Sequence, residues 1–218
     1  MAPMALRTFS ATLLLALGAA RGQPLPELRI EPTTGGSIFY VKNVASQPVT
    51  AFLIELVNYP GSYYSLWQDE AASELIAPGA EKRIPVTNMT VGAVPDYVKL
   101  QAALFADGSS AGIPEKITQI VERRRFTLGT IRELIARIEK AQAASVPKAA
   151  LIADLRQWGD SLQPPRRTNP TSQTTVNQTA ARGIIADAAA WLDSHSPDET
   201  LAKLRAGERS LASSKPAL

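Results

Sequence analysis

Short β-rich segments fill the first half of the chain, and turns containing Pro or Gly bound each of them. We expect strands over Ser37–Val44, Val49–Tyr59, the short stretch Tyr63–Trp67, Lys82–Val86 and Tyr97–Ala106. Alternation is clearest in the last segment, where every second residue is apolar. The proline of the fourth segment, Pro85, cannot donate to a strand ladder, which predicts an edge position. Five or six short strands without intervening helices predict an antiparallel β-sandwich.

After Gly112 the spacing of apolar residues changes from two to about 3.6, the period of an amphipathic helix. Gly129 is a candidate break, because the residues after it have the form of a capping box. A proline-bearing polar linker, residues 163–175, separates the second predicted helix from the third. We expect three to four helices, over Pro114–Ala144, Lys148–Leu162, Val176–Trp191 and a short stretch from the Ser196 cap to Leu211.

These patterns predict an α+β chain in which a sandwich comes first and a helical region follows. The predicted divisions are a signal peptide over 1–22, a β-sandwich over 23–110, a helical region over 111–213 and a disordered tail over 214–218. The change of period, and not any one motif, sets the boundary between the sandwich and the helices.

The N-terminus has the composition of a secretory signal peptide. Arg7 supplies the positive charge, and Thr8–Ala20 is apolar or small throughout. Small residues at Ala20 and Gly22 suit signal peptidase cleavage before Gln23. The apolar stretch is shorter than the ~20 residues of a membrane-spanning helix, so we expect a periplasmic or extracellular protein without a transmembrane anchor after cleavage.

The stretch Ser37–Ala106 resembles the immunoglobulin- or fibronectin-type sandwiches of exported bacterial proteins. The resemblance is carried by the strand–turn–strand block Val41–Ala51, the turn Ala77–Gly79 and the strand end Leu104–Ser109. It covers about a third of the chain and implies a fold, with no catalytic residue attached to it. The helical half resembles no family that we can name.

The amino-acid composition limits the kinds of chemical site that the chain can form. Among the 218 residues there is no cysteine and a single histidine, His195, so we expect no metal site, no disulfide and no cofactor. The formal net charge of the whole chain is +3, but the charged residues are distributed unevenly along it. Residues 23–109 carry 5 basic and 9 acidic side chains, and residues 110–218 carry 16 and 11. The two halves could attract each other, or the basic half could face an anionic partner.

One candidate for catalysis is the segment Gly108–Gly112, which matches the G-x-S-x-G pattern of a nucleophile elbow. Ser110 would be the nucleophile, and His195 would be its base. An α/β-hydrolase also needs alternating strands and helices before the elbow, and this chain lacks them. We therefore expect Ser110 in a turn or linker, and keep a serine hydrolase only as an alternative.

Candidate binding residues fall into two groups. Arg123, Arg124 and Arg125 form the sharpest basic cluster, which could grip an anionic cell-envelope polymer or pair with the acidic sandwich. Nucleic acid is not an expected partner of an exported chain. The aromatic residues Tyr63, Tyr64 and Trp67 could recognise a partner if exposed and would be core if buried.

A third feature is the group of carboxylates at Asp69, Glu70 and Glu74, which is interpreted as a solvated loop because the spacing of a calcium-binding loop is absent. The sequence as a whole predicts an exported, non-catalytic interaction or scaffolding module. Its partner is an unidentified protein or an envelope polymer.

Overall fold

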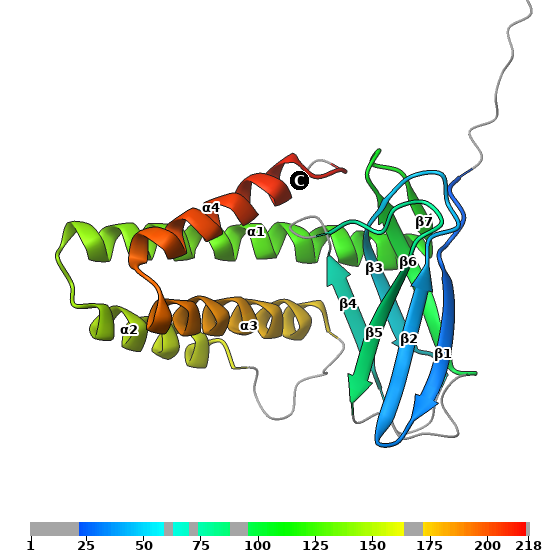
Figure 1. Ribbon diagram of the computed structural model, residues 1–218, viewed down its shortest axis with the longest axis horizontal. Coiled ribbons are helices and arrows are strands. Elements are labelled where there is room, and N and C mark those ends of the chain that lie inside the picture. Colours follow the sequence, from blue (N-terminus) through cyan, green and yellow to red (C-terminus); the bar gives the residue numbers. More distant parts are fainter. Residues whose placement is uncertain (1–21, 59–62, 70–73, 88–95, 164–171, 217–218) are drawn as a thin grey trace, which may run out of the picture.

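A computed structural model describes residues 22–58, 63–69, 74–87, 96–163 and 172–216. Within these ranges the chain forms seven strands and then four helices, with the sandwich at one end of the molecule and the helices extending away from it (Figure 1). The strands are β1 (Glu27–Thr33), β2 (Gly36–Lys42), β3 (Val49–Leu56), β4 (Ser65–Asp69), β5 (Glu81–Thr87), β6 (Val98–Phe105) and β7 (Ser110–Gly112). The helices are α1 (Pro114–Ala143), α2 (Lys148–Ser161), α3 (Gln173–Ser194) and α4 (Pro197–Ser213).

The strands form two antiparallel sheets, one with the order β1-β2-β5 and the other with the order β4-β3-β6-β7. The predicted α+β class and the order of strands before helices are therefore confirmed. β5 lies at the edge of its sheet, as Pro85 predicted. The core between the sheets contains buried side chains from both, chiefly Phe39, Val41, Phe52, Ile54, Ile84, Val86 and Phe105.

β3 is buried on both faces, which explains its nearly continuous apolar sequence. Phe52 and Ile54 point into the core between the sheets. Ala51 and Leu53 point the other way, into a second core that includes Ile120 of α1. An isolated sandwich would turn this second face to water, so the helical region completes the burial of the sheet.

Two strands were not expected from the sequence. β1 pairs with β2 along its whole length and half-buries Leu28 and Ile30 against the sandwich core. Its signal was an alternation of charged and apolar residues followed by a turn at Gly35, whose φ of +83° favours glycine. β7 pairs with β6 and contains Ser110, so the expectation that Ser110 lies in a linker is wrong.

α1 is a single helix that starts at the sandwich and runs the length of the helical region (Figure 1). The helix continues through Gly129, so the sequence does not break the helix at this residue. α3 and α4 pack against α1, and α2 packs against α3. Their shared core contains Leu134, Ile138, Leu155, Ile185 and Leu192, all fully buried.

The ends of the helices agree with the expected caps in part. Ser196 begins α4 with a complete capping box to Glu199, as predicted. α3 begins at Gln173, inside the predicted polar linker. Ser214 and Lys215 contact α1, where the sequence suggested a disordered tail. The predicted signal peptide lies outside the described residues, except for Gly22.

Candidate functional site

Two groups of residues that the sequence singled out meet where the sandwich joins the helices. Trp67 lies on β4, the edge strand of the four-stranded sheet, and Arg123 lies on the first half of α1. The guanidinium carbon of Arg123 is 5.3 Å from the centroid of the Trp67 ring. This is within the range of a cation–π contact.

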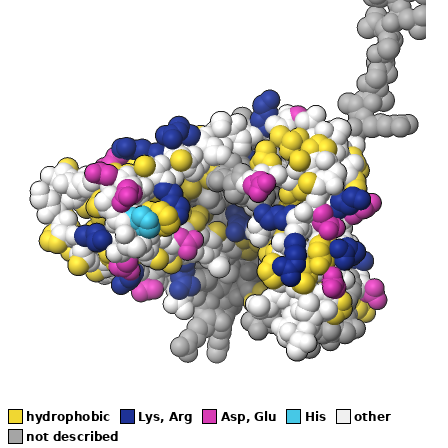
Figure 2. All heavy atoms as spheres, in the orientation of Figure 1, with side chains coloured by type: hydrophobic (Ala, Val, Ile, Leu, Met, Phe, Trp, Pro, Cys, Tyr) yellow, Lys and Arg dark blue, Asp and Glu magenta, His cyan; other side chains and the backbone are white. Residues whose placement is uncertain are grey.

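The three consecutive arginines point in different directions, because successive residues of a helix are rotated by about 100°. Arg124 is buried, Arg123 is half-buried, and Arg125 is exposed. They do not form the common basic face that adhesion to a polymer would use. Figure 2 shows Lys and Arg side chains intermixed with Asp and Glu on the visible face, without one basic patch.

Arg124 connects the sandwich to α1. Its side chain is 0% exposed and binds Asp69 at the end of β4 in bidentate fashion, with Nε donating to Oδ2 at 2.7 Å and Nη2 donating to Oδ1 at 2.8 Å. Nη2 also donates to Thr50 Oγ1 at 3.2 Å. The arginine therefore joins α1 to both β3 and β4.

The same guanidinium holds the C-terminal segment. Its Nη1 donates to the backbone oxygen of Lys215 at 2.9 Å and to Ser214 Oγ at 3.3 Å. Arg124 is thus a fully bonded internal residue, which corrects its candidate role as an exposed binding residue. Asp69 departs from the predicted solvated loop because it is the last residue of β4 and its side chain, 28% exposed, pairs with Arg124, whereas Glu74 is exposed as expected and Glu70 lies outside the described residues.

A second ion pair crosses the same boundary. Lys116 Nζ, in the first turn of α1, lies 2.7 Å from Glu55 Oε2 on β3. Both pairs join an acidic residue of the sandwich to a basic residue of α1. At these two ion pairs, the opposite net charges of the two halves attract each other within the chain.

Arg123 differs from its neighbour because it forms no ion pair with any described residue. Burial lowers the pKa of Arg123 to about 10, and the nearby carboxylate of Asp69 opposes this shift by favouring the charged form. The group stays cationic at neutral pH. Asp69 already accepts two hydrogen bonds from Arg124, so among the described residues two guanidinium groups share one carboxylate, and no ion pair to Arg123 is formed.

Arg123 also lines a hollow of about 190 Å³. It is lined by residues of β4, α1 and α3, namely Trp67, Gln68, Asp69, Ile120, Arg123, Thr127, Ala180 and Ile184. We call this hollow the junction site. Within the described part of the chain, Arg123 and Asp69 are the only charged residues of its lining, and the aromatic ring of Trp67 and the polar groups of Gln68 and Thr127 complete it.

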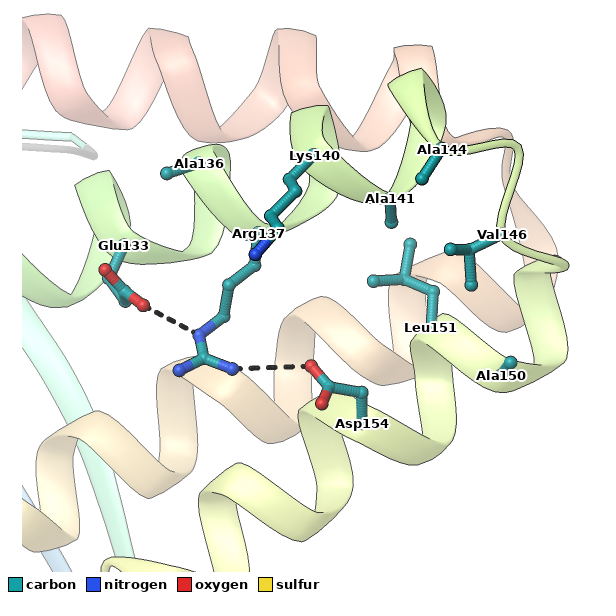
Figure 3. A pocket seen from close by; sticks show the side chains of 10 residues that line it. All are labelled: Glu133, Ala136, Arg137, Lys140, Ala141, Ala144, Val146, Ala150, Leu151 and Asp154. Atoms are coloured by element: carbon teal, nitrogen blue, oxygen red, sulfur yellow. Dashed lines mark hydrogen bonds and ion pairs between the residues drawn. The ribbon is translucent and has the colours of Figure 1, made fainter.

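A larger hollow of about 480 Å³ lies between α1 and α2, but its charges are already matched (Figure 3). Arg137 reaches across it between two carboxylates, with Nε 2.8 Å from Glu133 and Nη1 3.4 Å from Asp154. Its guanidinium also lies over the ring of Trp158. This arginine has carboxylate partners within the chain, which distinguishes it from Arg123.

The tyrosines next to Trp67 have separate environments. Tyr63 is 61% exposed. Tyr64 is half-buried and packs edge-on against Phe39 in the sandwich core, with ring centroids 6.2 Å apart, and burial raises the pKa of its hydroxyl. Only Trp67 of the three belongs to the junction site.

The structure does not bring Ser110 and His195 together. Ser110 lies on β7 in the sandwich, whereas His195 follows the last residue of α3, at the far end of the helical region (Figure 1). The imidazole stacks on Trp191 with ring centroids 3.7 Å apart, and Nδ1 is 2.9 Å from Ser194 Oγ. No triad can be built from this arrangement.

The glycines around Ser110 have structural roles in the sandwich. Gly108 and Gly112 have φ values of +92° and +107°, which favour glycine. A side chain at Gly112 would also collide with the backbone oxygen of Gln101 on β6. The G-x-S-x-G match therefore reflects a turn and a short edge strand.

Two other kinds of site are absent from the described residues. These residues contain no group of three or more His, Asp or Glu side chains that could hold a metal ion. None of the helices in the described ranges combines the length and the apolar character needed to cross a bilayer.

Comparison of the chain with family models, curated proteins and solved structures gives no match.

Proposed function

We propose that this protein is an exported, non-catalytic interaction module that binds an anionic group of its partner at the junction site. The observation that carries the proposal is that the half-buried Arg123 lines a hollow and forms no ion pair with a described residue, while the one described carboxylate of the lining, Asp69, is already bound by Arg124. The lining of the junction site comes from β4, α1 and α3, so the elements that form the scaffold also form the site.

A bound anion would place a negative charge next to the positive charge of Arg123 in this hollow. Removing a charged group from water is costly unless the protein supplies an opposite charge and hydrogen bonds. Asp69 compensates Arg124, so a ligand would be the counter-charge for Arg123. Charge-assisted hydrogen bonds from a guanidinium to an anion are stronger than neutral ones, which makes Arg123 the central contact of the proposed site.

The strand order supports an immunoglobulin- or fibronectin-type sandwich as part of this proposal. If β1, β2 and β5 correspond to strands A, B and E, then β3, β6 and β7 correspond to C, F and G, the order of that class. β4 then extends the C–F–G sheet beside strand C. Sandwiches of this class commonly use loops and edge strands to contact partners, and β4 is such an edge strand.

The anion site can be tested by titrating the purified protein with acetate, phosphate and sulfate at constant ionic strength. We expect a saturable shift of the Trp67 indole N–H resonance in nitrogen-resolved NMR spectra. Arg123→Gln should weaken this binding by at least about tenfold, because it removes the charge-assisted contact. Its stability should change by no more than about 1 kcal/mol, since Arg123 makes no ion pair or hydrogen bond to a described residue and the substitution removes only its contact with the Trp67 ring.

Arg125→Gln is the matched control, because it removes an exposed charge from the same helical turn. It should bind the anions as the unmodified protein does. The proposal would be abandoned if no anion in the panel gave saturation, or if Arg123→Gln and Arg125→Gln had equal effects.

Export is a separate part of the proposal and has its own test. We expect the full chain, produced in a bacterial host, to be recovered outside the cytoplasm with Gln23 as its first residue by mass spectrometry. Leu14→Lys should block this processing by interrupting the apolar segment of the predicted signal peptide. Recovery of an unprocessed chain beginning at Met1 in the cytoplasm would contradict export.

A further inference from the structure

The charge balance of the junction site limits the anions that it can accept. Among the described residues, the site has one positive charge from Arg123 and one negative charge from Asp69, and the Arg124 guanidinium bound to Asp69 adds a second positive charge. A monoanion would leave the group neutral. A dianion would leave a net negative charge in a partly desolvated site next to the Asp69 carboxylate, and this arrangement is unfavourable.

The size and shape of the junction site limit its ligands further. A hollow of about 190 Å³ is smaller than the ~300–1,000 Å³ of typical small-molecule sites, so it suits one functional group with a short body. The guanidinium is planar and matches a carboxylate through two parallel hydrogen bonds. The indole of Trp67, over which the Arg123 guanidinium lies, lines the same hollow, so the carbon atoms of a ligand bound to Arg123 can pack against it.

The edge of β4 indicates how a carboxylate on a peptide could reach Arg123. The amide of Leu56 donates to the oxygen of Tyr64, so Tyr64, Leu66 and Gln68 direct their backbone groups toward β3. The backbone groups of Ser65 and Trp67 alternate with them and point away from β3. An extended peptide could pair with this edge, beside the Arg123 guanidinium.

From these observations we infer that the junction site is selective for a carboxylate monoanion, supplied by a small organic acid or by the carboxyl terminus of a peptide. This inference rests on the proposed function and specifies its ligand class. The two sources share the same chemistry at Arg123, and they differ in whether the edge of β4 is also used.

The test compares ligands on the complete protein through the Trp67 indole N–H resonance. The measurements are made at about pH 8.5, where inorganic phosphate is mainly a dianion. The probes are acetate, benzoate, neutral benzamide, inorganic phosphate, sulfate, and trialanine with a free or an amidated carboxyl terminus. We expect the carboxylates to bind at least about tenfold more tightly than sulfate or phosphate. Benzamide and amidated trialanine should not saturate, and Arg123→Gln should abolish the preference for carboxylates.

The outcomes separate this inference from the proposed function. Sulfate or phosphate binding as tightly as the carboxylates, and depending on Arg123, would overturn carboxylate selectivity and leave the anion site in place. Absence of saturation by every probe would overturn both. If trialanine binds at least tenfold more tightly than acetate, the carboxylate source is a peptide on the β4 edge, and equal affinities identify a small acid.

Discussion

Replacing Arg124 with alanine is expected to lower the free energy of unfolding by about 4 kcal/mol, more than any other single substitution that we propose. The change leaves the Asp69 carboxylate without its bidentate partner in a site where it is only 28% exposed. It also removes the hydrogen bonds to Thr50, Ser214 and Lys215 that fix β3 and the C-terminal segment to α1. Urea denaturation followed by circular dichroism measures the loss.

Arg125→Ala is the control, because it deletes the same side chain from an exposed position one residue further along α1. Its effect should stay within about 0.5 kcal/mol. The double variant Arg124→Ala/Asp69→Ala should be less destabilised than the sum of the two single variants, since each single change leaves a charge without its partner. Equal losses for Arg124→Ala and Arg125→Ala would show that Arg124 is not an internal connection.

The second large effect is expected for Leu53→Ala, which should reduce stability by about 3 kcal/mol. Leu53 is fully buried on the outer face of β3, between the sheet and α1. Truncation removes apolar surface from this interface and leaves a cavity that the rigid sheet cannot fill. The denaturation midpoint measures the change, with the slope of the transition monitored for loss of cooperativity.

Leu75→Ala provides the matched comparison, because the same atoms are deleted from a residue that is 38% exposed. A loss within about 0.5 kcal/mol is expected there. If Leu53→Ala were equally mild, the helices would not be packed on the outer face of the sheet. The junction site would then lack the rigid frame on which the proposed binding depends.

Arg123 and Arg124 show how adjacent residues acquire different roles. Both are arginines on the same turn of α1, and both lie near Asp69. The carboxylate accepts two hydrogen bonds from the guanidinium of Arg124, and Thr50 and the C-terminal segment accept the others. Arg123 is left beside Trp67, where burial makes its charge costly and a ligand could compensate it.

The sequence alone determined the order and type of most elements, because those depend on local periodicity. Alternation and turns located five strands, the change to a 3.6-residue period located all four helices, and Pro85 identified an edge strand. The uneven charge of the two halves also indicated the attraction that appears as the pairs from α1 to Glu55 and Asp69. β1 was missed because none of its residues is fully buried, and β7 was missed because it is only three residues long.

Only the tertiary structure decided which side chains meet. Trp67 and Arg123 are 56 positions apart in the numbering, and nothing in their local sequence indicates that β4 and α1 lie side by side. The same holds for Ser110 and His195, whose order along the chain fitted a hydrolase although the fold separates them. Periodicity specifies which face of an element is buried, but the packing of whole elements against one another determines which residues share a site.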